Sequence, residues 1–491
     1  MFKNLKDADM DLLSEGVLTV LEKLGMTCQN KEILTVLEDR GAYVDYETWN
    51  ARFPQKMIRQ FVEEIKKEDK DTWEKEIQKS EHRQTLLSGY VPYVKEAGEF
   101  KAPHVPFMFH PLGTFYLDEE TGEKRKGNKK DFIRMTKLGD VLHPEHGVGH
   151  SLNLSDVPSQ VEPLEAAMLL LEYAHNPRGV YVEDLRQIDY LREIEDIMGI
   201  NDPYWHWLAN ISFAAPLKLG KDISERFLYM LKSGNYPAKI YTMAISGVNM
   251  PVTTAGSIVL SAAEVIALWF SARAVNPKVP LTGMILSGVL NMKTGQVNYW
   301  TFDTLIRRLS ICEFVRKWTG VAISPGIGEY TPAKHPGFYT TLEKAYLAMT
   351  IAAFTGHHPE MGIGHLESGL TLSPVQLLLD REFTAGLRYL EPPVINEETI
   401  GLETIMEIGF GIERNYLDTE HTLKNFRSCL WEPKIFDISG WDSESEANNL
   451  KKASGEIARL IEEYKKPEVD PEKIEKTRKV IERAKKELLP G

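Results

Sequence analysis

The stretch AKIYTMAISGVNMPVTTAGSIVLSAAEVIALWFSARAVNPKVPLTGMIL, residues 238–286, decides the fold that we expect for this chain. It begins with a β-prone run at 238–246, continues with an apolar helical run at 255–272, and ends with a second β-prone run at 279–286. A strand, a helix and a second strand in this order form the repeat unit of a parallel sheet covered by helices. The stretch therefore predicts an α/β fold.

The same alternation extends over most of the chain. Seven β-then-α units can be counted, with strands at 147–155, 179–183, 206–213, 238–246, 279–286, 320–324 and 360–364. Seven consecutive units favour a closed (β/α)8 TIM-type barrel over an open sheet, although the sequence does not place an eighth strand. We therefore predict an N-terminal helical region at 1–102, a TIM-type barrel at 103–440, and C-terminal helices at 441–491 packed on the barrel.

The composition is that of an ordinary globular chain with an acidic balance. Of its 491 residues 43% are hydrophobic, and 58 Lys and Arg residues against 71 Asp and Glu residues give a formal net charge of −13. This balance argues against nucleic acid as the main partner, because a phosphate backbone requires a basic surface. The sequence also lacks a signal-like N-terminus and an uninterrupted apolar run of membrane-spanning length. We expect a cytoplasmic protein without a membrane partner.

Motifs exclude several common kinds of site. The three cysteines lie far apart and form neither a zinc pattern nor a disulfide framework. The chain lacks a phosphate-binding Walker loop, a complete dinucleotide-binding glycine motif, H-E-x-x-H and G-x-S-x-G. His143, His146 and His150 have ligand-like spacing. We place them where the chain enters a strand, at the bottom of the barrel, and expect no metal site.

Polar side chains occur where the predicted strands end. In a barrel of this type, the C-terminal ends of the strands and the loops after them form the site. The second strand ends in Glu183, the third carries Asn210 on the face opposite its apolar residues, and the fourth ends in Ser246. We predict that these three side chains bind substrate. For Asn210, a buried polar group satisfied by its neighbours is the alternative.

The loop after the sixth strand, SPGIGEYTPAKHPGFY at 324–339, combines a stiff backbone with aromatic side chains. Loops on the top of a barrel commonly carry function, and aromatic faces attract cations. We therefore predict that Tyr330, His335 and Phe338 bind a cationic substrate. The alternative is a stiff lid that only excludes water.

The segment GIGHLESGLTLSPVQLLLD at 362–380 contains the sharpest candidates for catalytic groups. Its glycines at 362 and 364 permit a close approach of the backbone, and the Ser-Pro-Val-Gln run from 373 predicts a capped helix. His365 and Glu367 are two residues apart, so in an extended segment they point the same way. We predict both as catalytic residues, with a satisfied structural pair as the alternative.

Four blocks of the chain resemble the trimethylamine methyltransferase family. They are VLEKLGMTCQNKEILTVLEDRGAYVD (20–45), SGVNMPVTTAGSIVLSAAEVIAL (246–268), GHLESGLTLSPVQLLLDREF (364–383) and GIERNYLDTEHTLKNFR (411–427). The resemblance implies a barrel enzyme that transfers a methyl group from a small amine to cobalamin, a corrinoid, carried by a partner protein. The chain has only standard residues, whereas the founding enzymes of the family carry pyrrolysine.

A member without pyrrolysine implies a quaternary amine as substrate, of the betaine type, such as glycine betaine, proline betaine or carnitine. A corrinoid-binding D-x-H-x-x-G pattern is absent from the chain, so we expect the cobalamin on a separate corrinoid protein that docks over the barrel mouth. Two alternatives stay open: another methyl donor, such as a methylated amine or a sulfonium, and a betaine-binding protein that transfers nothing. Assembly into a homo-oligomer is also left open.

Overall fold

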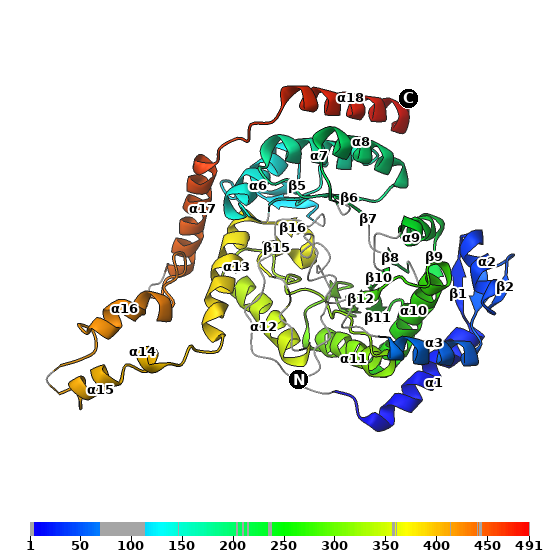
Figure 1. Ribbon diagram of the computed structural model, residues 1–491, viewed down its shortest axis with the longest axis horizontal. Helices are drawn as coiled ribbons and strands as arrows, with labels where there is room; N and C mark the ends of the chain where they lie inside the picture. The colour runs from blue at the N-terminus through cyan, green and yellow to red at the C-terminus, as the bar shows by residue number, and fades with distance from the viewer. Residues whose placement is uncertain are drawn as a thin grey trace.

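The computed structural model describes residues 4–68, 113–145, 147–202, 205–208, 211–213, 216–233, 238–355, 359, 361–412, 414–438, 440 and 444–490. Within them the fold is mixed α/β; most of the short strands lie inside a ring of helices, and the N-terminal strands lie at its edge (Figure 1). The helices are α1 (Asp7–Lys23), α2 (Lys31–Asp39), α3 (Gln55–Lys67), α6 (Lys129–Leu142), α7 (Glu162–Tyr173), α8 (Ile188–Met198), α9 (Lys221–Ser233), α10 (Thr254–Val275), α11 (Phe302–Thr319), α12 (Phe338–Thr355), α13 (Pro374–Leu387), α14 (Glu397–Ile400), α15 (Leu402–Ile408), α16 (Glu420–Cys429), α17 (Ser445–Glu463) and α18 (Pro471–Leu488). The strands are β1 (Met26–Cys28), β2 (Tyr43–Asp45), β3 (Asn50–Arg52), β4 (Phe115–Leu117), β5 (Lys124–Lys126), β6 (Val180–Val182), β7 (His206–Leu208), β8 (Ile211–Ser212), β9 (Lys218–Leu219), β10 (Ala238–Thr242), β11 (Ile245–Ser246), β12 (Leu281–Ile285), β13 (Gly288–Leu290), β14 (Val297–Asn298), β15 (His365–Leu366) and β16 (Thr371–Leu372).

Consecutive segments of the chain pair in parallel and in sequence order. Val148 bridges Pro177 just before β6, β6 pairs with β7, β8 pairs with β10, β10 pairs with β12, and Met284 of β12 bridges Ser324. Helices α7 to α11 follow these segments in turn, as the β-then-α reading of 238–286 predicts. The described strands form small sheets and none of these sheets closes, so the pairings show an ordered α/β fold and not a closed barrel.

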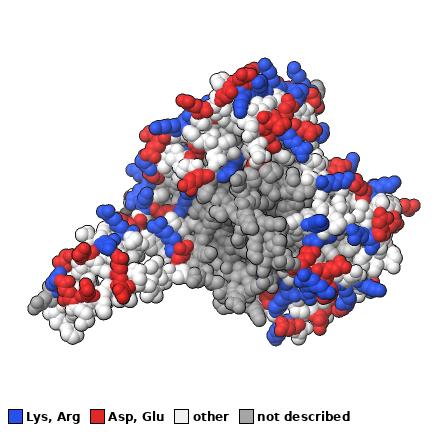
Figure 2. Space-filling view, viewed as in Figure 1, with Lys and Arg blue, Asp and Glu red and all other residues white. Residues whose placement is uncertain are grey.

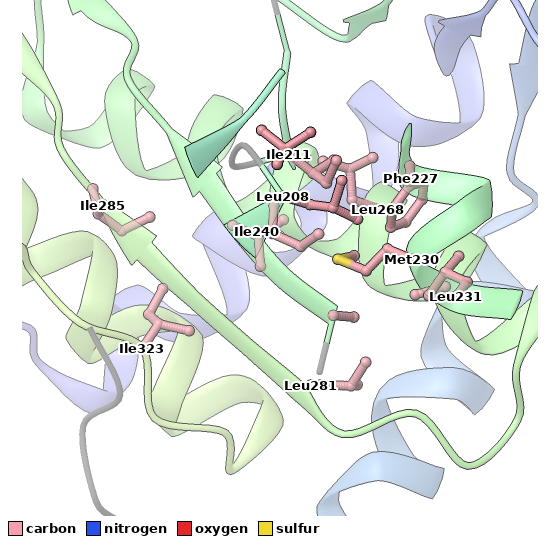
Figure 3. Packing of buried hydrophobic residues seen from close by; sticks show 14 of the residues in the cluster. Leu208, Ile211, Phe227, Met230, Leu231, Ile240, Leu268, Leu281, Ile285 and Ile323 are labelled. Atoms are coloured by element: carbon pink, nitrogen blue, oxygen red, sulfur yellow. The ribbon is translucent and has the colours of Figure 1, made fainter. Parts of the chain in front are cut away.

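The outward-facing side of these strands is apolar and packs on the helices. Figure 3 shows Leu208, Ile211 and Ile240 packed with Phe227 of α9 and Leu268 of α10, and all five side chains are buried. Burial of a large apolar side chain contributes roughly 1.5–3 kcal/mol. This layer fixes the strands, and therefore the loops at their ends, relative to the helices.

The sequence predicted a helical N-terminal region, but this region also contains strands. Helices α1, α2 and α3 agree with the helical region predicted at 1–102, but β1, β2 and β3 form a small antiparallel sheet among them, and β1 also pairs in parallel with β9. Each of these strands has three residues, which is too short for a period-two pattern to be recognised. The boundary predicted at 102–103 lies outside the described residues.

The C-terminal helices lie on the outside of the ring. Helix α17 packs against α13 and α6, and α18 packs against α7 and α8. Between α13 and α17, helices α14, α15 and α16 project away from the ring (Figure 1). These residues fall within the region 103–440 that the sequence predicts as a barrel.

Helix α10 is long and apolar enough to cross a membrane by length and composition alone. Its apolar window is 78% buried inside the protein. It is the core helix that the sequence predicted at 255–272.

Candidate functional site

A cavity of about 1280 Å³ opens at the C-terminal ends of the parallel strands. Its wall includes Tyr181 and Glu183 at the end of β6, Met243 after β10, Leu286 after β12, and Tyr330 in the loop that follows Ser324. Ligands bind at this end in α/β folds, because side chains from several strand ends converge there. The cavity is therefore the candidate site.

One turn of the cavity wall has an uncommon backbone conformation. Glu367 and Ser368, between the antiparallel strands β15 and β16, have φ values of 50° and 59°. The Glu367 amide donates to the Ala333 carbonyl at 2.9 Å, and the Ser368 amide donates to the Thr331 carbonyl at 2.6 Å. Such left-handed residues cost about 1–3 kcal/mol each and cluster at functional sites. The two bonds hold the turn against the loop that carries Tyr330.

Gly369 allows this turn to lie directly on the Tyr330 ring. A Cβ atom at position 369 would be 2.6 Å from Cε1 of Tyr330, and the φ of Gly369 is 95°. Only glycine combines this backbone conformation with this close approach. The Leu-Glu-Ser-Gly-Leu run at 366–370 therefore sets the position of Tyr330 in the wall.

The Glu367 carboxylate lines the cavity and is already paired. It accepts a hydrogen bond from Thr371 Oγ1 at 2.5 Å and forms an ion pair with Lys124 of β5. Burial raises the pKa of Glu367, but the hydrogen bonds from Lys124 and Thr371 and the charge of Lys334 outweigh burial, so this pKa is below its ordinary value. Glu367 is thus an anion at neutral pH, with Lys124 as its counter-ion.

His365 and Glu367 do not share a direction. His365 has no exposed surface and is not part of the cavity wall, whereas Glu367 is. Residues two apart point the same way only in an extended segment, and the chain leaves the extended conformation at Glu367. Gly364 likewise approaches α13 instead of a ligand, since a Cβ there would be 2.7 Å from the Leu377 nitrogen.

The remaining predicted binding residues divide into two groups. Tyr330 and Glu183 line the cavity. Ser246 is fully buried outside the wall, with its hydroxyl 3.3 Å from that of Ser257. Asn210 lies outside the described residues.

His335 and Phe338 are exposed on the surface and are not part of the cavity wall. The Phe338 ring packs edge-on against Phe436, with 5.2 Å between ring centroids. The loop at 324–339 therefore turns outward after Lys334, and Tyr330 is the one of its three predicted cation-binding residues that reaches the cavity.

His150 lies in the cavity wall, contrary to the predicted position at the bottom of the barrel. The paired segment is shorter than the predicted strand 147–155: Val148 bridges Pro177, and the His150 amide donates to the Gly179 carbonyl at 3.3 Å. His150 therefore stands at the C-terminal end of this segment. Its Nε2 is 3.0 Å from Glu162 Oε1.

Two further tyrosines and two lysines complete the chemistry of the wall. They are Tyr181, Tyr299, Lys126 and Lys334. Among the described residues, neither lysine forms an ion pair or a side-chain hydrogen bond, and the same holds for Glu183. Burial raises the pKa of Tyr299, so it stays an uncharged phenol. The wall thus offers aromatic rings and a carboxylate to a cation, and two ammonium groups to an anion.

A fully buried ion-pair network anchors the residue before Tyr330. Lys344 Nζ of α12 lies 2.8 Å from Glu329 Oε2 and 2.5 Å from Asp380 Oδ2. Glu329 Oε1 accepts a hydrogen bond from the Ile363 amide at 2.9 Å. The network joins the sixth-strand loop to α12, α13 and the segment before β15.

The cap predicted at Ser373 is confirmed in part. Ser373 Oγ accepts a hydrogen bond from the Gln376 amide at 3.2 Å, as an N-cap residue does. The Gln376 side chain does not return to Ser373. It donates to Asp380 Oδ1 at 2.5 Å and so belongs to the buried network.

No group of three or more His, Cys, Asp or Glu side chains that could hold a metal ion occurs within the described part of the chain. Fold and cavity together define an α/β protein with a candidate small-molecule site at its strand ends, lined by groups of both charges. The family described as Trimethylamine methyltransferase (MTTB) matches residues 99–489, and the chain belongs to this family. It is a methyltransferase acting on methylated amines, and the resemblance predicted from the four blocks is confirmed.

Three relatives show the range of the family. The chain is 22% identical to the trimethylamine methyltransferase MttB of Desulfitobacterium hafniense (strain DSM 10664 / DCB-2), over 98% of this chain and 94% of the relative. It is 20% identical to the glycine betaine methyltransferase of Desulfitobacterium hafniense (strain Y51), over 99% of this chain and 97% of the relative. It is also 21% identical to the L-carnitine:corrinoid methyltransferase of Eubacterium limosum, over 59% of this chain and 57% of the relative. These names cover three amines, so the substrate of this chain has to be inferred from the residues of its cavity.

Proposed function

We propose that this chain transfers a methyl group from a small zwitterionic quaternary amine, of the betaine type, to a corrinoid carried by a separate protein. The observation that carries the proposal is the charge arrangement of the cavity wall. Glu183 and three tyrosines suit a permanent cation, while Lys126 and Lys334 suit a carboxylate. Names of the relatives support the same reaction class.

A quaternary ammonium group has no N–H to donate, so only aromatic faces and negative charge can recognise it. Tyr181, Tyr299 and Tyr330 supply the faces, and each cation–π contact contributes about 0.5–2 kcal/mol. Glu183 supplies the charge in this proposal. Glu367 has Lys124 as its counter-ion, whereas Glu183 has no ion-pair partner among the described residues.

The substrate carboxylate is assigned to Lys126 and Lys334. Both line the cavity, and neither forms an ion pair within the described residues. A hydrogen bond to a charged group contributes about 1.5–3 kcal/mol. Trimethylamine has no carboxylate, so these lysines would favour a betaine over trimethylamine. His365, predicted from the sequence as a catalytic residue, is the alternative anchor for the carboxylate, but its complete burial argues for the lysines.

A corrinoid on the partner protein would supply a cobalt(I) nucleophile as methyl acceptor, and the nitrogen would keep the electron pair of the broken C–N bond. The leaving tertiary amine is neutral, so no residue of this chain has to donate or remove a proton. The residues of the wall bind the substrate, orient its C–N bond and exclude water, and such positioning can supply much of the rate. The rigid Glu367–Ser368 turn and the anchored Tyr330 loop suit this role.

Docking of the partner over the cavity is supported by apolar groups beside it. Val248 and Val252 follow β11, Met292 follows β13, and all three are exposed. Met292 lies over Gly247, where an added Cβ would be 2.7 Å from its Cε. The six segments that pair in parallel order support a further part of the proposal, namely a (β/α)8 barrel with this face as its mouth.

The test is incubation of the purified chain with cob(I)alamin and separate methyl donors, followed by the absorbance of methylcobalamin. The panel contains glycine betaine, proline betaine, carnitine, trimethylamine and a carboxylated sulfonium. We expect methylation from one of the betaines and none from trimethylamine. Methylation from the sulfonium alone would show that the substrate is a sulfonium and not a quaternary amine. Calorimetric binding of a betaine with no transfer from any donor would show that the chain is a binding protein.

A further inference from the structure

The segment 391–430, here called the arm, projects from the ring of helices and carries α14, α15 and α16 (Figure 1). Within these three helices, all of them described, Ile408 is the single buried residue. Large apolar side chains are exposed along the whole arm, with Phe410 99% and Ile412 88% accessible. So many exposed apolar side chains in one segment mark an interaction site. We propose that the arm packs against a second copy of this chain.

The area of the arm is sufficient for a stable interface. Val394, Ile395, Met406, Phe410, Ile412 and Leu417 are among its mostly exposed side chains, and Ile400, Leu402 and Leu423 add to them. At roughly 60–120 Å² for each side chain, these nine present several hundred Å² of apolar surface. A stable interface needs about 800 Å² from each partner, and flanking polar groups supply part of that area.

The charge of the arm argues against a membrane as its occupant. Residues 391–430 contain eight acidic residues and three basic ones, which gives 3 − 8 = −5. Figure 2 shows acidic groups beside uncharged surface on the arm, at the lower left. Amphipathic segments that bind membranes carry Lys and Arg on their polar face, because the lipid surface is anionic.

The broad apolar surface of the arm argues against the corrinoid protein as its binding partner. A carrier that exchanges with each turnover needs a transient interface, and transient interfaces are smaller and more polar than permanent ones. A broad apolar arm suits a partner that stays bound. Another copy of the same chain is such a partner.

The same chain carries a second exposed apolar surface that can receive the arm. Helices α11 and α12 expose Phe302, Ile306, Tyr339, Leu342 and Tyr346. The rings of Phe302 and Tyr346 are 5.5 Å apart, so this surface is continuous across the two helices. Two copies can therefore exchange arms reciprocally, each arm covering the α11–α12 surface of its partner. Such an isologous contact closes with two-fold symmetry.

Light scattering of the full-length chain after size exclusion tests the assembly. The arm variant is F410S/I412S/L417S, whose three positions lie in the loop between α15 and α16, where serine is tolerated. The matched control is L12S/L24S/Y43S, three exposed apolar residues of the N-terminal region. We expect an even number of 55.9 kDa chains for wild type and control, and a single chain for the arm variant. A single-chain wild type, or an arm variant with unchanged mass, would overturn the proposal.

A cross-linking experiment tests the acceptor. Asn415 at the exposed end of the arm becomes the reactive position in N415C/C429S, because Cys28 and Cys312 are buried. The thiol is labelled with a benzophenone maleimide, and unlabelled protein is mixed with ¹⁵N protein before illumination. We expect mixed-isotope adducts on peptides within 302–346. Adducts confined to one chain would contradict the exchange, and so would a single-chain wild type that floats with phosphatidylserine vesicles.

Discussion

Lys344 Nζ lies 2.8 Å from Glu329 Oε2, and neither side chain has exposed surface. Asp380 Oδ2 lies 2.5 Å from the same ammonium, so one buried cation faces two buried carboxylates. Glu329 directly precedes Tyr330, and its other oxygen accepts from the Ile363 amide. The position of the Tyr330 ring in the cavity therefore depends on a charge network whose side chains lie outside the cavity wall.

Removal of Lys344 should destabilise the protein strongly. Lys344→Met leaves two carboxylates buried without their cation, and breaking a buried pair in this way costs about 3–5 kcal/mol. The measurement is the free energy of unfolding from urea denaturation. Lys479→Met on the surface of α18 is the control, with an expected change within about 0.5 kcal/mol. Equal stability of the two variants would show that the network carries little energy.

Stability should depend on pH through Glu264 of α10. Its side chain is buried and accepts from the Leu217 amide at 3.2 Å, and burial raises its pKa from 4.5 to about 7. The folded state therefore binds the proton more tightly than the unfolded state. The resulting stability is fully present below pH 4.5, falls as the pH rises to about 7, and is absent above it.

Glu264→Gln keeps the hydrogen-bond acceptor and removes this titration. As the pH rises from 5 to 8, the unfolding free energy of the variant minus that of the wild type should increase by up to about 3 kcal/mol. Glu225→Gln on the surface of α9 serves as the control and should follow the wild type at every pH. Parallel profiles for Glu264→Gln and the wild type would show that Glu264 is ionised in the folded state.

Gly369→Ala should disturb the Tyr330 ring as well as the backbone. Its Cβ would meet the ring at 2.6 Å, so we expect a loss of at least tenfold in betaine affinity by calorimetry. Gly122→Ala is a matched control, because Gly122 also has a positive φ of 70° but has open space around its Cβ position. Its backbone strain should cost about 1–2 kcal/mol of stability and leave affinity unchanged. If both variants bind a betaine like the wild type, Tyr330 is not part of the binding site.

The two lysines of the wall should control recognition of the substrate carboxylate. Lys126→Met and Lys334→Met should each weaken betaine binding, and the residue that contacts the carboxylate should account for about 1.5–3 kcal/mol. His365→Gln is measured beside them by the same calorimetric titration. A loss confined to His365→Gln, in a variant with native thermal stability, would restore His365 as the anchor and remove both lysines from the site.

Most of the repeating fold could be predicted from the sequence, because each unit contains an apolar strand and a helix long enough to show its period. Helix α10 begins at Thr254, beside the predicted run 255–272, and α13 begins directly after its predicted cap, Ser373. The direction of His365 could not be predicted, since it depends on a left-handed residue at Glu367 that no periodicity reveals. The arm was missed for a related reason: a helical pattern does not say whether its apolar residues find a partner within the chain.

The candidate site was predicted only in part. Glu183, Tyr330 and Glu367 follow predicted strands in the sequence and line the cavity. They could be predicted because site residues in this kind of fold follow the ends of strands. Lys126 lies on β5, the second strand of the antiparallel β4–β5 pair, and Tyr299 lies beyond the β13–β14 hairpin. Both reach the cavity only through tertiary packing. The buried network around Lys344 has no sequence signal either, because its members are 15 and 36 residues apart.

The most direct measurement of the central claim follows the methyl group itself. Glycine betaine, proline betaine and carnitine, each with deuterated N-methyl groups, are incubated with the chain and a corrinoid protein reduced to cobalt(I), and both products are analysed by mass spectrometry. We predict that one of these betaines gives a trideuteromethyl corrinoid and an equal amount of its N-demethylated tertiary amine, and that Glu183→Gln lowers both together. Transfer of methyl groups from trimethylamine but from none of the betaines would contradict the account.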